Sequence, residues 1–297
     1  MQKNIDHYFL CIMISSKITK GFIMQPDITS AKKYFKTHFA ENGMFSDYSA
    51  AYAVTNEDLR HSLRYIPENA ENALVVAGSG DHPLFSALYG AKNTDAFDIS
   101  YNAKLIMDIK TAALPILNHQ EYCEMVMNLY KFDDKITSVE NISKIIENLP
   151  TEEQQYIKDM QGYHLFAHGR SPNSYKPSPL PTETEYNKMR NIVRKPFNFI
   201  WSDIATLHAK LDKSYDFMHL SNIADYLSVP QKTAVITSLI NHTRPGSVMC
   251  FQSLDPNIPV ILRQHCEKYS NNAWALRCST MWHDKSKDEI YLLKRER

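Results

Sequence analysis

The stretch from Ala73 to Ser100, ALVVAGSGDHPLFSALYGAKNTDAFDIS, constrains the fold more than any other part of the chain. A short apolar run, Ala73–Ala77, ends abruptly at Gly78-Ser79-Gly80-Asp81, and the residues that follow place apolar side chains at helical spacing until the next glycine. A second predicted strand, Thr94–Ile99, carries an acidic residue, Asp98. Strand, turn, helix and strand in this order predict a βαβ unit.

The glycines of this unit predict a ligand close to the backbone. The chain has only 8 glycines, and Gly78, Gly80 and Gly90 lie close together in sequence. A residue without Cβ permits a positive φ and lets a ligand approach the main chain. Asp98 follows at the offset where dinucleotide-type folds place the carboxylate that binds the ribose hydroxyls. We therefore expect a nucleotide-type site, with an ordinary βα turn as the alternative.

The residues after the turn indicate which ligand this would be. Pro83 stands where a phosphate-binding fingerprint would have its third glycine, and no Lys-Ser/Thr pair of a P-loop is nearby. Asp81 would repel phosphates but suits a cationic sulfonium. These features favour S-adenosylmethionine over NAD or ATP.

Composition excludes several classes of protein. The chain has 297 residues, of which 43% are hydrophobic, enough to bury one large core. Thirty-three basic and thirty-three acidic residues leave no net charge, so a nucleic-acid partner is not indicated. The five cysteines are far apart, with no C-x-x-C and no histidine at ligand spacing, so neither a disulfide framework nor a metal site is predicted. This cysteine usage favours a reducing, cytoplasmic location.

The N-terminal region is expected to precede the sheet. Tyr8–Ile14 is apolar but too short to span a bilayer, and Met24 opens a more ordinary start, so residues 1–23 are a possible extension. We expect no transmembrane segment, which leaves peripheral membrane contact open. Residues 24–70 form a predicted helical segment. Its Tyr48 is a candidate for closing over the ligand and binding substrate, with packing in the core as the alternative.

A long insertion separates the second and third predicted strands of the sheet. Residues 131–194 are polar, include a proline-rich loop, and are predicted to form a mainly helical cap. Arg170 lies beside that loop and is a candidate for binding an anionic group of the substrate. The alternative is a solvated surface arginine.

The rest of the chain completes the predicted sheet. Apolar runs at Phe197–Trp201, Tyr215–Leu220 and Val248–Ser253 alternate with helices, and Ala273–Ser279 and Glu289–Lys294 read as closing antiparallel strands. Alternating strands and helices predict an α/β fold, a three-layer Rossmann-like sandwich over residues 71–297.

Ligands of such sheets lie at the carboxyl ends of the strands, so Asp81, Asp98, Asp203 and the segment Ser221–Asp225 are expected to converge. Asp203 is a candidate for binding the adenine amino group, with a helix N-cap as the alternative. His219 and Asp225 are candidate bases, although a histidine inside a strand is more often packed in the core.

The motifs TNEDLR, AGSGD, GAKNTDAFDIS and YDFMHLSNIADYL resemble those of class I S-adenosylmethionine-dependent transferases, and more narrowly the bacterial group related to betaine-lipid synthase, the 3-amino-3-carboxypropyl transferases. The resemblance covers about residues 46–130 and 197–253. It implies a sheet of the class I methyltransferase type and a small-molecule or lipid acceptor. The candidate cofactor-binding residues are Ala77, Gly78, Ser79, Gly80, Asp81, Asp98, Ile99, Asp203 and Ser221. The candidate catalytic residues are Asn222, Asp225 and His219, and those for substrate binding are Tyr48, Tyr226 and Arg170.

Two chemistries fit the same cofactor. An acceptor that meets the methyl carbon is methylated, whereas one that meets Cγ of the methionine moiety receives the aminocarboxypropyl group. The resemblance favours the second. Methyl transfer and a non-catalytic cofactor-binding scaffold remain the alternatives.

Overall fold

The computed structural model of the chain describes residues 25–38, 46–129, 141–167, 180–253, 255, 257–268, 274–283 and 286–295. The possible extension over residues 1–23 and the candidate Arg170 lie outside the described residues.

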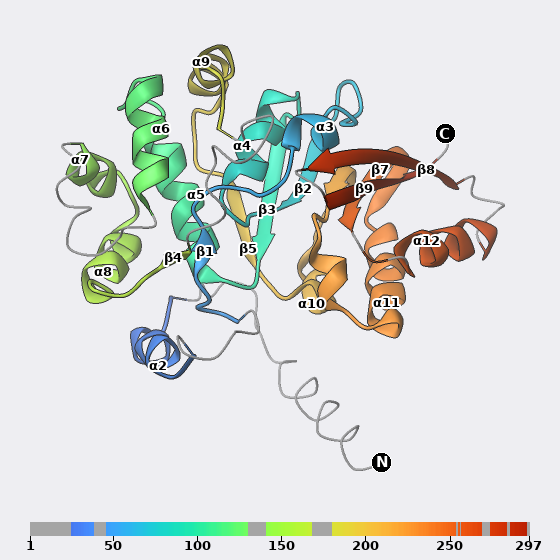
Figure 1. Cartoon of the computed structure of the whole chain (residues 1–297), viewed down its shortest axis with the longest axis horizontal. Helices are drawn as coiled ribbons and strands as arrows, with labels where there is room; N and C mark the ends of the chain where they lie inside the picture. The colour runs from blue at the N-terminus through green and yellow to red at the C-terminus, as the bar shows by residue number, and fades with distance from the viewer. Residues whose placement is uncertain are drawn as a thin grey trace.

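Helices and strands alternate along most of the described chain, as the sequence predicts (Figure 1). The strands are β1 (Ala51–Tyr52), β2 (Asn72–Val76), β3 (Asn93–Asp98), β4 (Phe166–Ala167), β5 (Asn198–Trp201), β6 (Tyr215–His219), β7 (Thr243–Ser253), β8 (Trp274–His283) and β9 (Ser286–Arg295). The helices are α2 (Ile28–His38), α3 (Leu59–Leu63), α4 (Asp81–Leu88), α5 (Tyr101–Ala113), α6 (His119–Asn128), α7 (Ile142–Glu147), α8 (Thr151–Asp159), α9 (Glu183–Ile192), α10 (Ile204–Leu207), α11 (Val229–Ile240) and α12 (Asn257–Lys268), with short 3-10 helices η4 (His208–Lys210) and η5 (Ile223–Tyr226).

Seven strands form the main sheet in the order β5-β3-β2-β6-β7-β9-β8. The first five are parallel, and β9 runs antiparallel to both β7 and β8. From β2 the chain order of the strands runs through β3 to β5 on one side and through β6 to β7 on the other. Open α/β sheets bind their ligands where the strand order reverses in this way. The predicted α/β sandwich with an antiparallel end is therefore confirmed.

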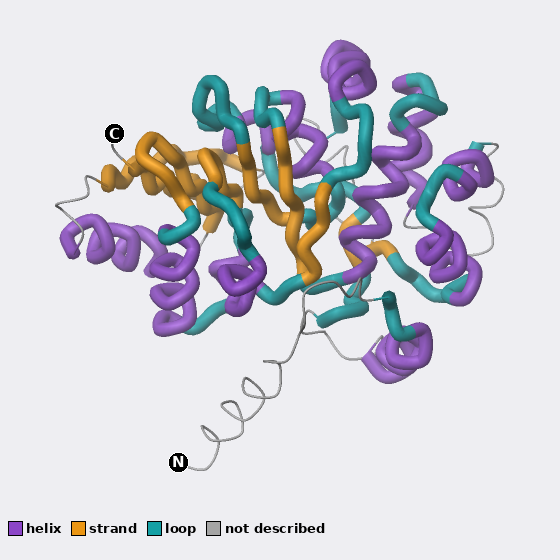
Figure 2. The backbone as a smooth tube through the Cα atoms, turned by 180° about the vertical axis from the view of Figure 1, so that it is seen from behind, coloured by secondary structure: helices purple, strands orange, loops and turns teal. Residues whose placement is uncertain are grey.

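The two faces of the sheet bury two separate clusters of apolar side chains. Along β2, Ala73 and Val75 belong to one cluster and Leu74 and Val76 to the other, because successive side chains of a strand point to opposite faces. The first cluster includes residues of α4 to α9, and the second includes residues of α10 to α12. Figure 2 shows the strands between these two groups of helices.

The predicted insertion contributes to the first of these clusters. Tyr156 of α8 and Tyr186 of α9 are fully buried in it, and Arg60 of α3 donates to Glu185 of α9 at 2.6 and 2.7 Å. The short strand β4 of the insertion pairs in parallel with β1, outside the main sheet. The described part of the insertion thus packs against α3, α4 and α5. In the described part of the chain, no helix is long and apolar enough to cross a membrane.

Candidate functional site

The turn after β2 is fastened to the end of β3. The backbone N–H of Gly78 donates to Asp98 Oδ2 at 2.9 Å, and the N–H of Ser100 donates to Asp98 Oδ1, also at 2.9 Å. Gly80 closes the turn by donating to the carbonyl of Ala77 at 2.7 Å. Asp98 therefore shapes the turn and lies directly beside it at the carboxyl edge of the sheet.

Glycine is needed at the two positions of this turn for different physical reasons. Both have positive φ, +51° at Gly78 and +79° at Gly80. A Cβ on Gly80 would lie 2.7 Å from the Cα of Met107, so this glycine lets α5 approach the turn. A Cβ on Gly78 would meet nothing closer than 3.4 Å, and the residue is partly exposed. Gly78 is therefore the residue of this pair that can present its backbone to a ligand.

Asp98 is partly exposed, and its carboxyl is hard to ionise. Desolvation raises its pKa to about 6, although the hydrogen bonds from Ser100 and Gly78 favour the charged form. The side chain thus changes charge close to neutral pH.

Asp81, in contrast, is buried, and its carboxylate binds groups of the protein itself. It is 5% exposed, and its carboxylate accepts from the N–H of Thr55 at 2.8 Å and from the hydroxyl of Ser79 at 2.7 Å. Lys110 of α5, fully buried, donates to its other oxygen at 2.5 Å. Burial lowers the pKa of Lys110, and the pairing with Asp81 opposes this. The structure therefore shows Asp81 and Ser79 holding the turn on α5, with the charge of Asp81 neutralised from within.

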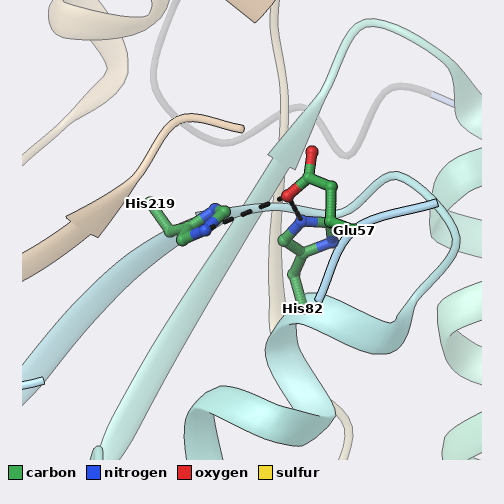
Figure 3. Close-up of side chains that lie close together, drawn as sticks. All are labelled: Glu57, His82 and His219. Atoms are coloured by element: carbon green, nitrogen blue, oxygen red, sulfur yellow. Dashed lines mark hydrogen bonds and ion pairs between the residues drawn. The ribbon is translucent and has the colours of Figure 1, made fainter. Parts of the chain in front are cut away.

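Glu57, from the loop before α3, lies at the centre of a second polar group. Its Oε2 is 3.1 Å from Nε2 of His82 on α4 and 4.0 Å from Nε2 of His219 at the end of β6 (Figure 3). Its Oε1 accepts a hydrogen bond from the hydroxyl of Ser221. All four residues are at most 5% exposed. Three segments that are distant in sequence are thus joined beneath the carboxyl edge of the sheet.

The charges in this group are set by competing effects. Burial would raise the pKa of Glu57, but the interactions with His82, His219 and Ser221 outweigh it and bring the pKa to about 2. Burial lowers the pKa of His219 to about 3, so its imidazole is neutral. Glu57 is accordingly an anion and His219 an uncharged ring at neutral pH.

The segment after β6 carries four of the candidate site residues. Ser221 has φ +52°, a left-handed conformation that costs a residue with a Cβ about 1–2 kcal/mol. Asn222 is partly exposed, and Tyr226 is 60% exposed. Asp225 is partly exposed and accepts a hydrogen bond from the hydroxyl of Ser253 on β7.

Two candidates have the structural role that was their alternative. Asp203 is the N-cap of α10 and accepts from the N–H of Ala205 at 2.7 Å. Tyr48 is buried, its ring packs edge-on against Trp201, and its hydroxyl accepts from the N–H of Asp27. Asp203 lies just after the end of β5, and Tyr48 packs against Trp201, the last residue of that strand. Trp201 Nε1 donates to the carbonyl of Ile99 at 2.6 Å. These contacts position the edge of the sheet.

Glu57, His82 and Lys110 were missed as functional candidates. His82 stands directly after the predicted turn, which was a usable signal. Glu57 lies in the segment TNEDLR that belongs to the resemblance, which was also a usable signal. Lys110 carries no local signal, since its partner Asp81 is brought to it only by the packing of α4 and α5.

No protein-family model and no curated protein matches the chain. Solved structures are similar at low identity. The N-methyltransferase NodS of Bradyrhizobium japonicum WM9, crystallised with S-adenosyl-L-homocysteine, is 9% identical over 91% of this chain and 98% of its own, with a TM-score of 0.40. An rRNA methylase of Streptococcus thermophilus is 10% identical over 82% and 99%, with a TM-score of 0.40. A ribosomal protein L11 methylase of Lactobacillus delbrueckii subsp. bulgaricus is 12% identical over 80% and 77%, with a TM-score of 0.38. All three TM-scores lie below 0.5.

Proposed function

We propose that the chain is an S-adenosylmethionine-dependent transferase that moves the 3-amino-3-carboxypropyl group to a small-molecule or lipid acceptor. The observation that carries this proposal is the hydrogen bond of 2.9 Å between the Gly78 N–H and Asp98 at the carboxyl edge of β2 and β3. It brings a partly exposed glycine backbone next to a carboxylate, the pair that nucleoside recognition uses at this position of a βαβ unit.

The residues present fit such a cofactor. Asp98 would accept hydrogen bonds from the ribose hydroxyls, because its side chain is partly exposed and two carboxylate oxygens offer about four acceptor positions. Gly78 would let the methionine moiety pass close to the turn, since no Cβ stands in its way. The buried Lys110–Asp81 pair holds this turn rigidly on α5.

When bound, the cofactor supplies a carbon activated by its sulfonium, and the acceptor's nucleophile takes that carbon while the sulfur leaves as a neutral thioether. The chain has to align the acceptor and remove its proton. Ser221 and Asn222 lie at the end of β6, which neighbours β2, and are the residues that we propose line the transfer site. Asp225, partly exposed in η5, is the proposed base for a hydroxyl acceptor.

The leaving thioether identifies the reaction. Aminocarboxypropyl transfer releases methylthioadenosine, and methyl transfer releases S-adenosylhomocysteine. The purified chain is incubated with S-adenosylmethionine and a cell extract treated to remove endogenous nucleosides, and the thioether is identified by mass spectrometry. We expect methylthioadenosine, reduced at least tenfold in Asp98→Ala and retained in Asp212→Ala, an exposed aspartate before β6 at the opposite edge of the sheet.

Accumulation of S-adenosylhomocysteine alone would replace the proposed reaction by methyl transfer. Formation of neither product, with the cofactor still bound, would favour a non-catalytic scaffold.

A further inference from the structure

We propose that Glu57, His82 and His219 form a binding site for one divalent transition-metal ion of the zinc class. This proposal rests on the three side chains alone and does not depend on the proposed transferase function. The ligand atoms that they offer all lie within 4.8 Å of one another, and all three residues are buried. Figure 3 shows both imidazole rings beside the Glu57 carboxylate.

The hydrogen bonding of the two histidines is incomplete among the described residues. Neither ring nitrogen of His219 has a hydrogen-bond partner there, and Nδ1 of His82 has none either. A buried polar atom without a partner costs roughly 1–3 kcal/mol. His219 is nevertheless fully buried, with Nε2 at 4.0 Å from Glu57 Oε2 and the two imidazole centroids 5.1 Å apart. The unpartnered nitrogen thus faces the same carboxylate that His82 contacts.

The distances are those of a site wider than its metal-bound form, since the three ligand atoms are separated by up to 4.8 Å. Zinc binds histidine nitrogen and carboxylate oxygen at about 2.0–2.2 Å, which places two ligand atoms of a tetrahedron about 3.3 Å apart. The 3.1 Å between Glu57 Oε2 and His82 Nε2 already matches this spacing. The 4.0 Å to His219 Nε2 requires an approach of less than about 1 Å, which side-chain rotation can supply.

The kind of ligand atom selects the metal. Two imidazoles and one carboxylate suit zinc, iron or cobalt, whereas magnesium and calcium prefer ligands that are all oxygen. The Ser221 hydroxyl donates a hydrogen bond to Glu57 Oε1. It would hold the carboxylate in position, as hydrogen-bond partners of metal ligands commonly do. This site departs from the sequence expectation of no metal, because its three residues are separated along the chain and meet only in the fold.

The metal would join three elements under the turn. His82 is on α4, His219 ends β6, and Glu57 lies before α3. A Cβ on Gly78 would lie 3.8 Å from Nδ1 of His82, so the site is immediately beneath the turn. Three protein ligands leave one position of the zinc tetrahedron to a solvent molecule or another small ligand. Because the three ligands come from separate segments, the ion would fix the carboxyl edge of the sheet.

The first experiment uses the wild-type full-length chain, stripped with a chelator and titrated with zinc chloride by calorimetry. We expect one tightly bound zinc per chain and an increase in the melting temperature on addition of zinc. X-ray absorption at the zinc edge should show nitrogen and oxygen neighbours at about 2.0–2.1 Å and none at the 2.3 Å of a thiolate. Absence of binding at one equivalent, or a sulfur shell, would overturn the proposal whatever the behaviour of the variants.

The second experiment locates the ion. His82→Gln and His219→Gln should each weaken zinc binding by about 100-fold or more, since a lost ligand costs more than a lost partner of a ligand. The matched control is His119→Gln. His119 Nε2 lies 3.4 Å from Cys123 Sγ, so these two atoms are an alternative pair of metal ligands elsewhere in the chain. Unchanged binding in His82→Gln, or loss of binding in the control, would place the metal elsewhere and contradict the proposal.

Discussion

At the scale of single residues, the site depends on polar groups that are buried in pairs. Asp81 and Lys110 are both almost inaccessible to solvent, and their charges neutralise one another inside the protein. A buried ion pair adds little stability compared with apolar residues, but removal of one partner leaves the other charge unpaired. The turn that carries Gly78 is therefore sensitive to changes at Lys110, a residue that would not touch the ligand.

We expect Lys110→Met to lower the free energy of unfolding by about 3–5 kcal/mol, because Asp81 would remain charged and buried. Adding Asp81→Asn should recover part of that loss, since the amide oxygen still accepts from the Thr55 N–H. Urea denaturation measures both. As a control, Lys92→Met removes an exposed pair with Glu71 and should cost at most about 1 kcal/mol. Equal losses for the two lysines would contradict the importance of the buried pair.

Asp98 gives a residue-scale prediction in pH. Its pKa of about 6 means that the carboxylate form, which accepts from hydroxyl groups, is lost as the pH falls below 6. Affinity for S-adenosylmethionine should therefore fall between pH 7 and pH 5, by up to about tenfold per unit at the acid end.

Calorimetry across this pH range tests the assignment, with Asp98→Asn expected to bind weakly and almost independently of pH. The pH dependence of stability has the opposite sign to that of affinity. Because the folded state holds this proton more tightly than the unfolded chain, the contribution of Asp98 to stability decreases as the pH rises from about 4 to about 6. A wild-type affinity that is flat over pH 5–7 would show that Asp98 does not titrate in the binding step.

At the scale of elements, the unit from β2 to β3 is built from local signals. The apolar run predicts β2 within a residue, and the turn glycines and helical spacing predict α4 within two. The reason for Gly80 lies outside this unit, because its missing Cβ makes room for the backbone of α5. A sequence motif can therefore predict that a glycine is needed without revealing what lies against it.

We expect Gly80→Ala to destabilise the protein more than Gly90→Ala. Both have positive φ, which costs alanine about 1–2 kcal/mol. Only at Gly80 would the new Cβ also meet the Met107 backbone, at 2.7 Å, adding about 1–3 kcal/mol of overpacking. Gly90 has nothing within 4 Å. Denaturant midpoints of the two variants give the comparison, and a smaller loss for Gly80→Ala would refute the packing explanation.

Elements without local periodicity were not predicted. The parallel pair β1 and β4 consists of two-residue strands, too short for any alternation to be recognised. Helix α9 lies in a polar stretch and was not predicted, although Thr182 and Glu185 have the spacing of a capping box at its start. In the structure Tyr186 is buried and donates to the carbonyl of Leu117 at 2.7 Å. The candidate site divides in the same way: Gly78 and Asp98 are recognisable from spacing, whereas the Glu57 contacts to His82 and Ser221 require the complete fold.

At the scale of the whole molecule, the sheet brings the chemistry-bearing residues to one edge. Strands β3, β2 and β6 are neighbours and parallel, so Asp98, Gly78 and Ser221 follow their carboxyl ends together. The helices of the insertion pack on the same side of the sheet as α4, which carries His82. The fold thus brings residues that are distant along the chain to one edge of the sheet.

The central claim is that this edge binds S-adenosylmethionine. The direct test is calorimetric titration of the purified full-length chain with S-adenosylmethionine, methylthioadenosine, NAD and ATP under identical conditions. We predict that S-adenosylmethionine binds at one site per chain more tightly than NAD or ATP. Asp98→Ala should weaken that binding by about 1–3 kcal/mol, as expected for hydrogen bonds to a charged group, while Asp212→Ala leaves it unchanged. Binding of NAD or ATP as tight as that of S-adenosylmethionine, or binding that survives Asp98→Ala undiminished, would contradict the account.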